Sequence, residues 1–114
     1  MSEVLTLENE AIKLRSEGKT TEEIETLNKL LAVDPNFVRA HLQLAVACLK
    51  VAEFERAVEH AEKACKLEPE DPFNFTSLSV TYQRVYAGTN DTSFIQKAEH
   101  AMDLARRIQS QAGH

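Results

Sequence analysis

The chain has 114 residues, a formal net charge of −5, 43% hydrophobic residues and 27% charged residues. These values suit one small globular domain and exclude a disordered chain. The negative charge argues against sequence-independent binding to nucleic acid and against binding to an anionic membrane. No apolar run is long enough to span a bilayer, and the first residues lack the basic and apolar blocks of a signal peptide, so we expect a cytoplasmic protein.

Apolar residues recur at spacings of three and four along most of the chain, which is the period of an α-helix. The first predicted helix covers residues 3–17 and stops at Gly18. Thr20 and Glu23 have the spacing of a capping box, which predicts the start of a second helix over 21–33.

The third and fourth predicted helices lie on either side of a short break. Asn36 is the expected N-cap of the third helix, over 37–51. The fourth helix covers 53–67 and ends before Pro69, because proline cannot continue the helical hydrogen-bond ladder.

The fifth predicted helix covers 72–86, with Asp71 as its N-cap and Pro72 at its first position. Residues 87–93 contain many turn formers and predict a loop. This loop is either a surface insertion that the fold tolerates or a loop that binds a partner.

The sixth predicted helix covers 92–109, with its register open by one residue, and residues 110–114 are expected to fray. Its predicted core stripe consists of Ile95, Ala98, Met102 and Ala105. Two further apolar residues, Leu104 and Ile108, lie on the same helix.

The chain repeats itself at a regular interval, the distance in sequence from Pro35 to Pro69. Each of these two prolines follows an acidic residue. The same shift aligns four more sets of helical residues: Leu7, His41 and Phe75; Ala11, Ala45 and Ser79; Leu14, Cys48 and Tyr82; Ile12, Val46 and Val80. Because small side chains let helices approach closely, the Ala–Ala–Ser set predicts one helix–helix contact built three times.

This pattern resembles the tetratricopeptide repeat (TPR), a helix–turn–helix unit of about 34 residues. The third unit carries the family's first-helix signature as Phe75-x-x-Leu78-Ser79-x-x-Tyr82. The other matches are at the family's small, glycine and proline positions: Ala57, Ala64 and Pro69 in the second unit, and Gly18 and Pro35 in the first, where Glu23 and Leu30 replace the small residues. The resemblance covers roughly residues 4–108.

The resemblance implies an all-α fold, a right-handed α-solenoid of three TPR units and six helices in a single domain. The expected units are residues 4–37, 38–71 and 72–109. If Ala98 and Ala105 are the small positions of the last helix, the third unit carries an insertion of seven residues.

In TPR arrays, the first helix of each unit also lines the concave surface of the superhelix. The corresponding positions here are Leu5, Glu8, Asn9, Ile12 and Arg15; Arg39, Leu42, Gln43, Val46, Leu49 and Lys50; Phe73, Thr76, Ser77, Val80, Gln83 and Arg84. All but Arg15, Thr76 and Gln83 form the predicted peptide-binding groove. If exposed, its apolar members would hold an amphipathic or extended segment of another protein. Alternatively, part of this stripe is ordinary core between adjacent first helices.

Two functions follow from this pattern. The favoured one is a non-catalytic interaction module, an adaptor or scaffold whose partner is a protein or peptide segment. The alternative is a self-assembling structural module that forms a homodimer through the groove or the uncapped last helix, with Leu104 and Ile108 as the dimer face.

One TPR subfamily is argued against. Chaperone-binding TPR domains hold a C-terminal carboxylate with Lys, Asn and Arg side chains. The matching positions here are Glu8, Ile12, Gln43, Phe73 and Ser77, and Glu8 would repel a carboxylate. We therefore predict no binding that depends on an acidic chaperone tail.

The reactive side chains are expected to have structural roles. His41 takes the family's aromatic core position, whereas His60 and His100 are expected on solvated faces. Cys48 and Cys65 are expected as free core thiols, with a disulfide or metal pair as the alternative. No HExxH, CxxC or phosphate-loop motif occurs, so we expect no enzyme, metal or cofactor.

Overall fold

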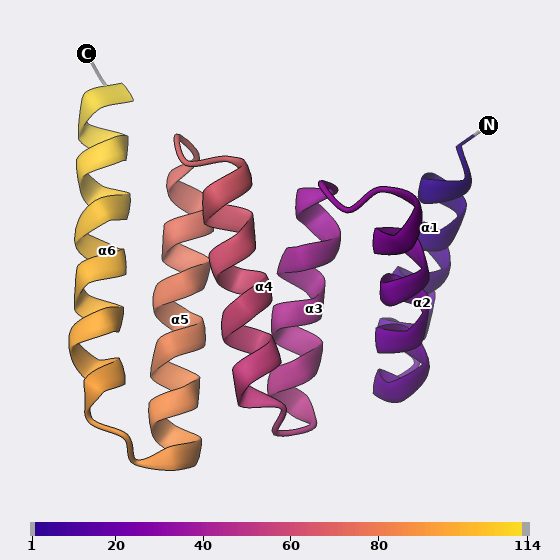
Figure 1. The fold of residues 1–114 in the computed structure, drawn as a ribbon, viewed down its shortest axis with the longest axis horizontal. Coiled ribbons are helices and arrows are strands. Elements are labelled where there is room, and N and C mark those ends of the chain that lie inside the picture. Colours follow the sequence, from indigo (N-terminus) through magenta and orange to yellow (C-terminus); the bar gives the residue numbers. More distant parts are fainter. Residues whose placement is uncertain (1, 113–114) are drawn as a thin grey trace.

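The computed structural model describes residues 2–112, which form six α-helices and no strand (Figure 1). The helices are α1 (Glu3–Ser16), α2 (Thr20–Val33), α3 (Val38–Lys50), α4 (Phe54–Leu67), α5 (Pro72–Thr89) and α6 (Ser93–Ala112). The chain is therefore all-α, as predicted from the helical periodicity.

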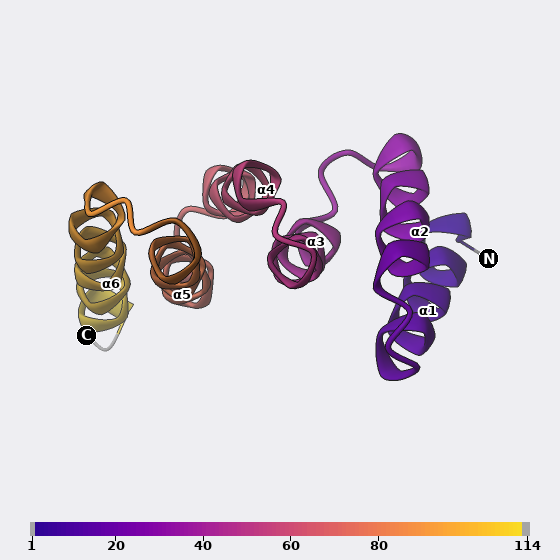
Figure 2. The same ribbon diagram turned by 90° about the horizontal axis from the view of Figure 1, so that it is seen from below.

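The two helices of each hairpin are antiparallel. Consecutive helices pack on one another, and α3 also packs on α5. The molecule is flat, with extents of 37 × 37 × 22 Å. Figure 2 looks nearly along α3 to α6, whereas α1 and α2 lie across the view, so the first hairpin is strongly inclined to the other two.

The small residue predicted at each first-helix contact is buried in all three places. Ala11 is 0%, Ala45 3% and Ser79 0% exposed. Ser79 adds a polar contact, since its Oγ donates a hydrogen bond of 2.8 Å to the carbonyl of Ala98 on α6. The three-fold recurrence in the sequence therefore corresponds to a three-fold recurrence in packing.

Two of the predicted N-caps are wrong. α2 is capped by Lys19 without a side-chain hydrogen bond, and Thr20 is already helical. α3 is preceded by Phe37, while the backbone N–H of Asn36 bonds to Asp34 Oδ1 in a local turn. In both cases, short polar residues next to the helix start make other contacts or none.

The cap of α5 is confirmed. Asp71 Oδ1 accepts a 2.9 Å hydrogen bond from the backbone N–H of Phe73, and Pro72 occupies the first helical turn. Proline is favoured there because its missing N–H would have no helical partner in any case.

The segment 87–93 differs from the loop predicted for it. α5 continues through Thr89, and only residues 90–92 connect it to α6. This connection is as long as 17–19 and 51–53, the turns inside the first two hairpins. α6 likewise continues to Ala112, so residues 110–112 are helical rather than frayed, and residues 113–114 lie outside the described part.

Helix extension accounts for the predicted insertion. Lys50 ends α3, and its equivalent Arg84 is followed by five more residues of α5. Phe54 begins α4, and α6 begins two residues before its equivalent, Ile95, in the register that aligns the buried Ala98 with Ala57. The seven extra residues therefore lengthen the third hairpin without lengthening its turn.

Candidate functional site

A groove of about 530 Å³ runs along α1, α3 and α5. Its lining residues are Glu8, Ile12, Arg15, Arg39, Leu42, Gln43, Ala45, Val46, Leu49, Phe73, Thr76, Ser77, Val80 and Thr81. These helices are the first of each hairpin, so the groove lies on the surface that the TPR resemblance implied.

The apolar side chains of this groove are open to solvent. Phe73 is 61%, Val46 52%, Val80 42% and Ile12 39% exposed. Only Leu42 and Leu49 among the large apolar lining residues are partly buried. Most of the stripe is therefore uncovered surface rather than core between adjacent helices.

The structure brings ten of the fourteen predicted groove residues to this one cavity. Leu5, Asn9, Lys50 and Arg84 lie outside its lining. Ala45 and Thr81 line it without having been predicted, because Ala45 was interpreted only as a helix contact. Arg15 and Thr76, which the helical period placed on the stripe, also line it.

Two of the lining residues, Glu8 and Arg39, form an ion pair. Arg39 on α3 donates two hydrogen bonds to Glu8 on α1, from Nε at 2.7 Å and from Nη2 at 3.0 Å. This bidentate contact lowers the pKa of the Glu8 carboxyl from its usual value. The guanidinium also lies 4.7 Å from the centre of the Phe37 ring. Glu8 is thus neutralised by a fixed partner and joins the first hairpin to the second.

Gln43 has a structural role beneath the groove. Its Nε2 donates to Glu23 Oε2 at 2.8 Å and to the carbonyl of Ala11 at 3.3 Å. Glu23 is only 1% exposed, so it does not complete the predicted capping box. Instead, the Gln43 amide links α1, α2 and α3, and its Nε2 donor is already used in these two hydrogen bonds.

A histidine pair lies on α3 and α4. His41 is buried and hydrogen-bonded, as predicted: its Nε2 is 2.8 Å from the carbonyl of Pro35, which can only accept. His41 Nδ1 lies 3.0 Å from His60 Nδ1 and, when both rings are neutral, accepts its proton in a hydrogen bond. The solvated position predicted for His60 is wrong, because its side chain is partly buried and hydrogen-bonded to His41. This burial lowers the pKa of His60 to about 4. His100 is exposed, as predicted.

The cysteines are free and buried, as expected from their apolar faces. Burial raises the pKa of Cys65 to about 11 and raises that of Cys48 in the same direction. Both therefore remain thiols at neutral pH, and thiols are weak nucleophiles and metal ligands. Within residues 2–112, no three His, Cys, Asp or Glu side chains come together as metal ligands.

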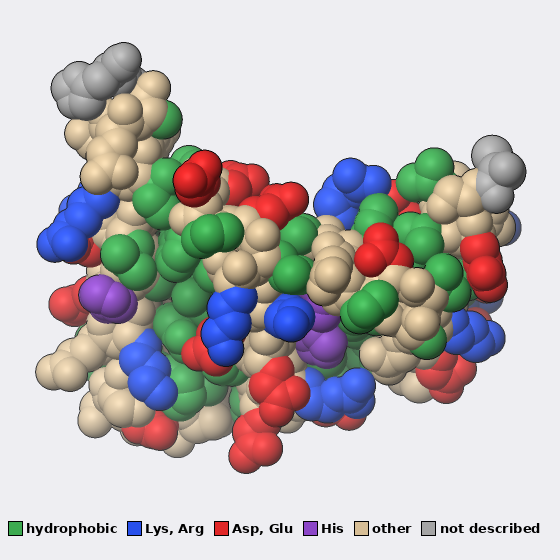
Figure 3. All heavy atoms as spheres, turned by 45° about the horizontal axis from the view of Figure 1, so that its top comes forward, with side chains coloured by type: hydrophobic (Ala, Val, Ile, Leu, Met, Phe, Trp, Pro, Cys, Tyr) green, Lys and Arg blue, Asp and Glu red, His purple; other side chains and the backbone are tan. Residues whose placement is uncertain are grey.

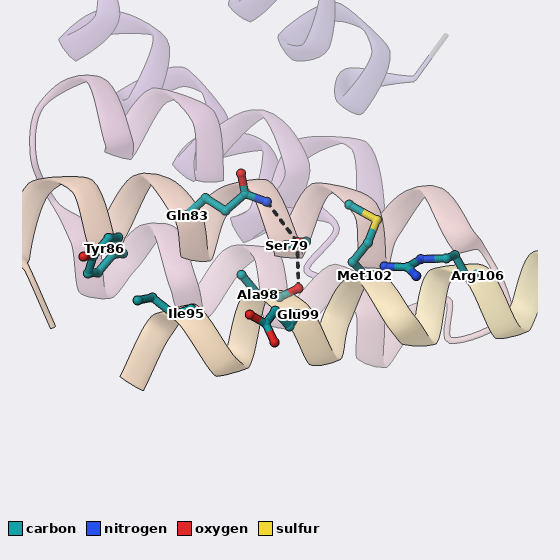
Figure 4. Close-up of a pocket in the computed structure, with 8 residues that line it drawn as sticks. All are labelled: Ser79, Gln83, Tyr86, Ile95, Ala98, Glu99, Met102 and Arg106. Carbon is teal, nitrogen blue, oxygen red and sulfur yellow. Dashed lines mark hydrogen bonds between the residues drawn. The ribbon is translucent and has the colours of Figure 1, made fainter. Parts of the chain in front are cut away.

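A second cavity, of about 490 Å³, lies between α5 and α6 (Figure 4). It is lined by Ser79, Gln83, Tyr86, Ile95, Ala98, Glu99, Met102 and Arg106. Ile95, predicted as core, is 39% exposed, and Met102 is only partly buried. The last helix therefore keeps an incompletely covered face, although Leu104 and Ile108 are themselves partly buried.

The surface drawn in Figure 3 mixes acidic and basic side chains, with hydrophobic ones between them. In the described part of the chain, no helix combines the length and the apolar character needed to cross a membrane.

Solved structures share this arrangement of helices, although no family model and no curated protein sequence matches the chain. Two MamA structures, MSR-1 C2 and the RS-1 ArsTM double mutant, align with TM-scores of 0.77 and 0.80 at 14% and 16% identity over 96% and 97% of this chain. A CopN–Scc3 complex aligns with a TM-score of 0.77 at 15% identity over 95% of this chain. The chain spans only 59%, 58% and 61% of these three proteins.

The TPR2B domain of yeast Sti1, solved in complex with pHsp70, aligns over 91% of this chain and 96% of its own, with a TM-score of 0.63 and 13% identity. These neighbours are TPR-containing proteins, and six helices make three TPR units. The fold is a tetratricopeptide-repeat solenoid. In TPR terms, α1, α3 and α5 are the first helices of the three units, and the groove is the concave surface they form.

Proposed function

We propose that the chain is a non-catalytic protein–protein interaction module that holds an apolar or amphipathic peptide segment in its concave groove. The observation that carries the proposal is the set of exposed apolar side chains, Ile12, Val46, Phe73 and Val80, that line a single cavity. Exposed apolar strips of this kind mark interaction sites.

The energetics are adequate for a reversible complex. Fully burying one such side chain is worth roughly 1.5–3 kcal/mol. Four anchors would therefore offset the cost of association and leave affinity on the order of micromolar. Related folds support the same role, because the CopN–Scc3 and TPR2B–pHsp70 structures are complexes with other proteins.

We further propose that recognition does not depend on a free C-terminal carboxylate. Ile12, Phe73 and Ser77 offer no cation at the positions where chaperone-binding TPR domains carry Lys, Asn or Arg. Gln43 is bonded to Glu23, and Glu8 already holds Arg39. Peptides with free and with amidated C-termini should therefore bind equally.

The test is selection from a displayed random-peptide library, followed by affinity measurement on synthetic peptides. We expect the selected peptides to carry apolar residues three or four apart. Val46→Glu places a charge in the apolar strip and should weaken binding by about tenfold or more, equivalent to ~1.4 kcal/mol. Val33→Glu is the matched control, since Val33 is 48% exposed on α2 and does not line the groove.

Circular dichroism of both variants should match the unaltered chain, because neither side chain is buried. If no peptide is enriched, or if Val46→Glu and Val33→Glu bind the selected peptides equally, the groove is not the binding site.

The alternative is self-assembly through the last helix, favoured by the exposed Ile95 and the cavity beside it. A dimer of this kind would persist on dilution in light scattering and be lost on Ile95→Glu or on Leu104→Glu with Ile108→Glu. Monomers at all concentrations would exclude it.

A further inference from the structure

The groove has a basic rim at one end, made of Arg15, Lys50 and Arg84. Arg15 lines the groove itself. Lys50 follows Val46 by four residues on α3, and Arg84 follows Val80 by four on α5, so each lies one helical turn beyond an exposed groove residue on the same face. The C-terminal ends of α1, α3 and α5 all lie toward the bottom of Figure 1, although α1 is inclined to the other two helices, so the three cations lie toward the same end of the groove.

The basic rim has no acidic partner within residues 2–112, since none of the ion pairs found there includes these three cations. The acids nearest in the sequence to Arg15 and to Lys50 are already paired. Glu17 lies 3.6 Å from Lys19, and Glu53 lies 3.4 Å from Arg56. The rim is therefore left with uncompensated positive charge in a chain whose net charge is −5.

Helix dipoles do not account for all of the rim. Arg15 and Lys50 lie in the last turns of α1 and α3, where a cation is favoured by the negative end of the helix. Arg84, in contrast, is five residues from Thr89, the end of α5, and the dipole effect falls off within the last turn. Arg84 has the same position on α5 that Lys50 has on α3, but the helix dipole does not explain a cation there.

We propose that the groove's occupant is an amphipathic protein segment that carries acidic side chains along the edge facing the basic rim. The apolar strip would hold its anchors, and the three cations would fix its register and orientation through charge complementarity. This inference rests on the proposed function. It is distinct from carboxylate capture, because acidic side chains are recognised and none of the three rim positions matches those of the chaperone-binding domains.

The probes are three acetylated and amidated helix-forming peptides that share a leucine stripe and differ along one edge, which carries Glu, Gln or Lys. Their affinities are measured at low and at high salt. We expect the Glu peptide to bind about tenfold more tightly than the Lys peptide at low salt, with a smaller difference at high salt because exposed charges are screened.

The chain variants are the triple reversal Arg15→Glu, Lys50→Glu and Arg84→Glu, and a matched triple reversal of exposed lysines outside the groove, Lys29→Glu, Lys63→Glu and Lys66→Glu. The rim reversal should invert the preference in favour of the Lys peptide, whereas the matched reversal should leave the order unchanged. This comparison removes the effect of net charge, which is altered equally in both.

Equal binding of all three peptides, lost on Val46→Glu, would overturn the acidic partner and leave the groove as the binding site. Absence of binding, or binding unaffected by Val46→Glu, would overturn the proposed function and this inference together. Vesicles rich in phosphatidylserine form the last arm, and binding to them that the rim reversal abolishes, without any preference among the peptides, would assign the rim to a membrane instead.

Discussion

At the residue scale, Gly18 and Ala52 share the same left-handed backbone conformation, although only alanine carries a Cβ atom. They occupy equivalent positions in the first two units, each lies two residues beyond the end of the first helix, and both have positive φ, 73° and 59°. Glycine adopts this left-handed conformation freely, whereas alanine does so at a cost because of its Cβ atom. Nothing lies within 4 Å of a Cβ added at Gly18, so a substitution there would be opposed by backbone strain and not by a steric clash.

We therefore predict opposite effects for exchanging the two residues. Ala52→Gly should raise the free energy of unfolding by about 0.5–1 kcal/mol, and Gly18→Ala should lower it by about 1 kcal/mol. Urea unfolding followed by circular dichroism measures both. Changes of the same sign in the two variants would contradict the equivalence of the turns.

His60 predicts a dependence of stability on pH. Its pKa is lowered from 6.5 to about 4 by burial and by the neighbouring His41 and Arg56. Protons therefore bind His60 more readily in the unfolded chain than in the folded chain. The contribution of neutral His60 to the free energy of unfolding is fully present above pH 6.5 and is lost as the pH falls toward 4. Allowing for partial solvation, we expect this loss to be about 2 kcal/mol.

His60→Gln, which keeps an N–H donor for His41, should flatten this part of the curve of unfolding free energy against pH. His100→Gln on the exposed face of α6 is the control and should follow the unaltered chain. Parallel curves for all three proteins would show that His60 is not the group responsible.

At the element scale, the lengthened α5 depends on a close contact at Gly88. A Cβ added at Gly88 would lie 2.3 Å from Cζ of Phe54, the first residue of α4. Glycine is otherwise unfavourable inside a helix, by about 1 kcal/mol relative to alanine. The extra turn of α5 thus has a glycine where it meets the aromatic ring of Phe54. At this position, the close contact with the ring outweighs the low helix propensity of glycine.

Gly88→Ala should accordingly destabilise the chain by about 1–3 kcal/mol, because the added methyl group overpacks against Phe54. In a Phe54→Ala background the same substitution should become stabilising, since only the gain in helix propensity remains. Urea unfolding of the four proteins of this double-mutant cycle gives the coupling directly. A zero coupling energy would mean that the two residues do not interact.

The elements show what local patterns can and cannot predict. All six helices were predicted, because apolar periodicity records which face each helix buries. The end of α5 was missed because Gly88 and Asn90 are turn formers by local preference, while contact with Phe54 is a property of the tertiary structure. Glu23 was assigned to a cap for the same reason: its partner, Gln43, lies twenty residues away on another helix.

At the scale of the whole molecule, the repeat interval together with the TPR resemblance predicts most of the residues that line the groove. A shift by one repeat puts Ile12, Val46 and Val80 on equivalent faces, and all three line one cavity. It could not reveal that Glu8 and Arg39 neutralise each other, because that contact joins two units and occurs once. The proposed chemistry of the partner depends only partly on the repeat, because Lys50 and Arg84 are one repeat apart whereas Arg15 has no basic equivalent in the other two units.

The packing of each helix mainly on its sequence neighbours has a consequence for how the chain folds. Most native contacts close only short loops, so little chain entropy is lost before they form. Such low contact order is typical of domains that fold in microseconds to milliseconds. In this architecture, a hairpin formed anywhere along the chain is a template on which its neighbour can assemble.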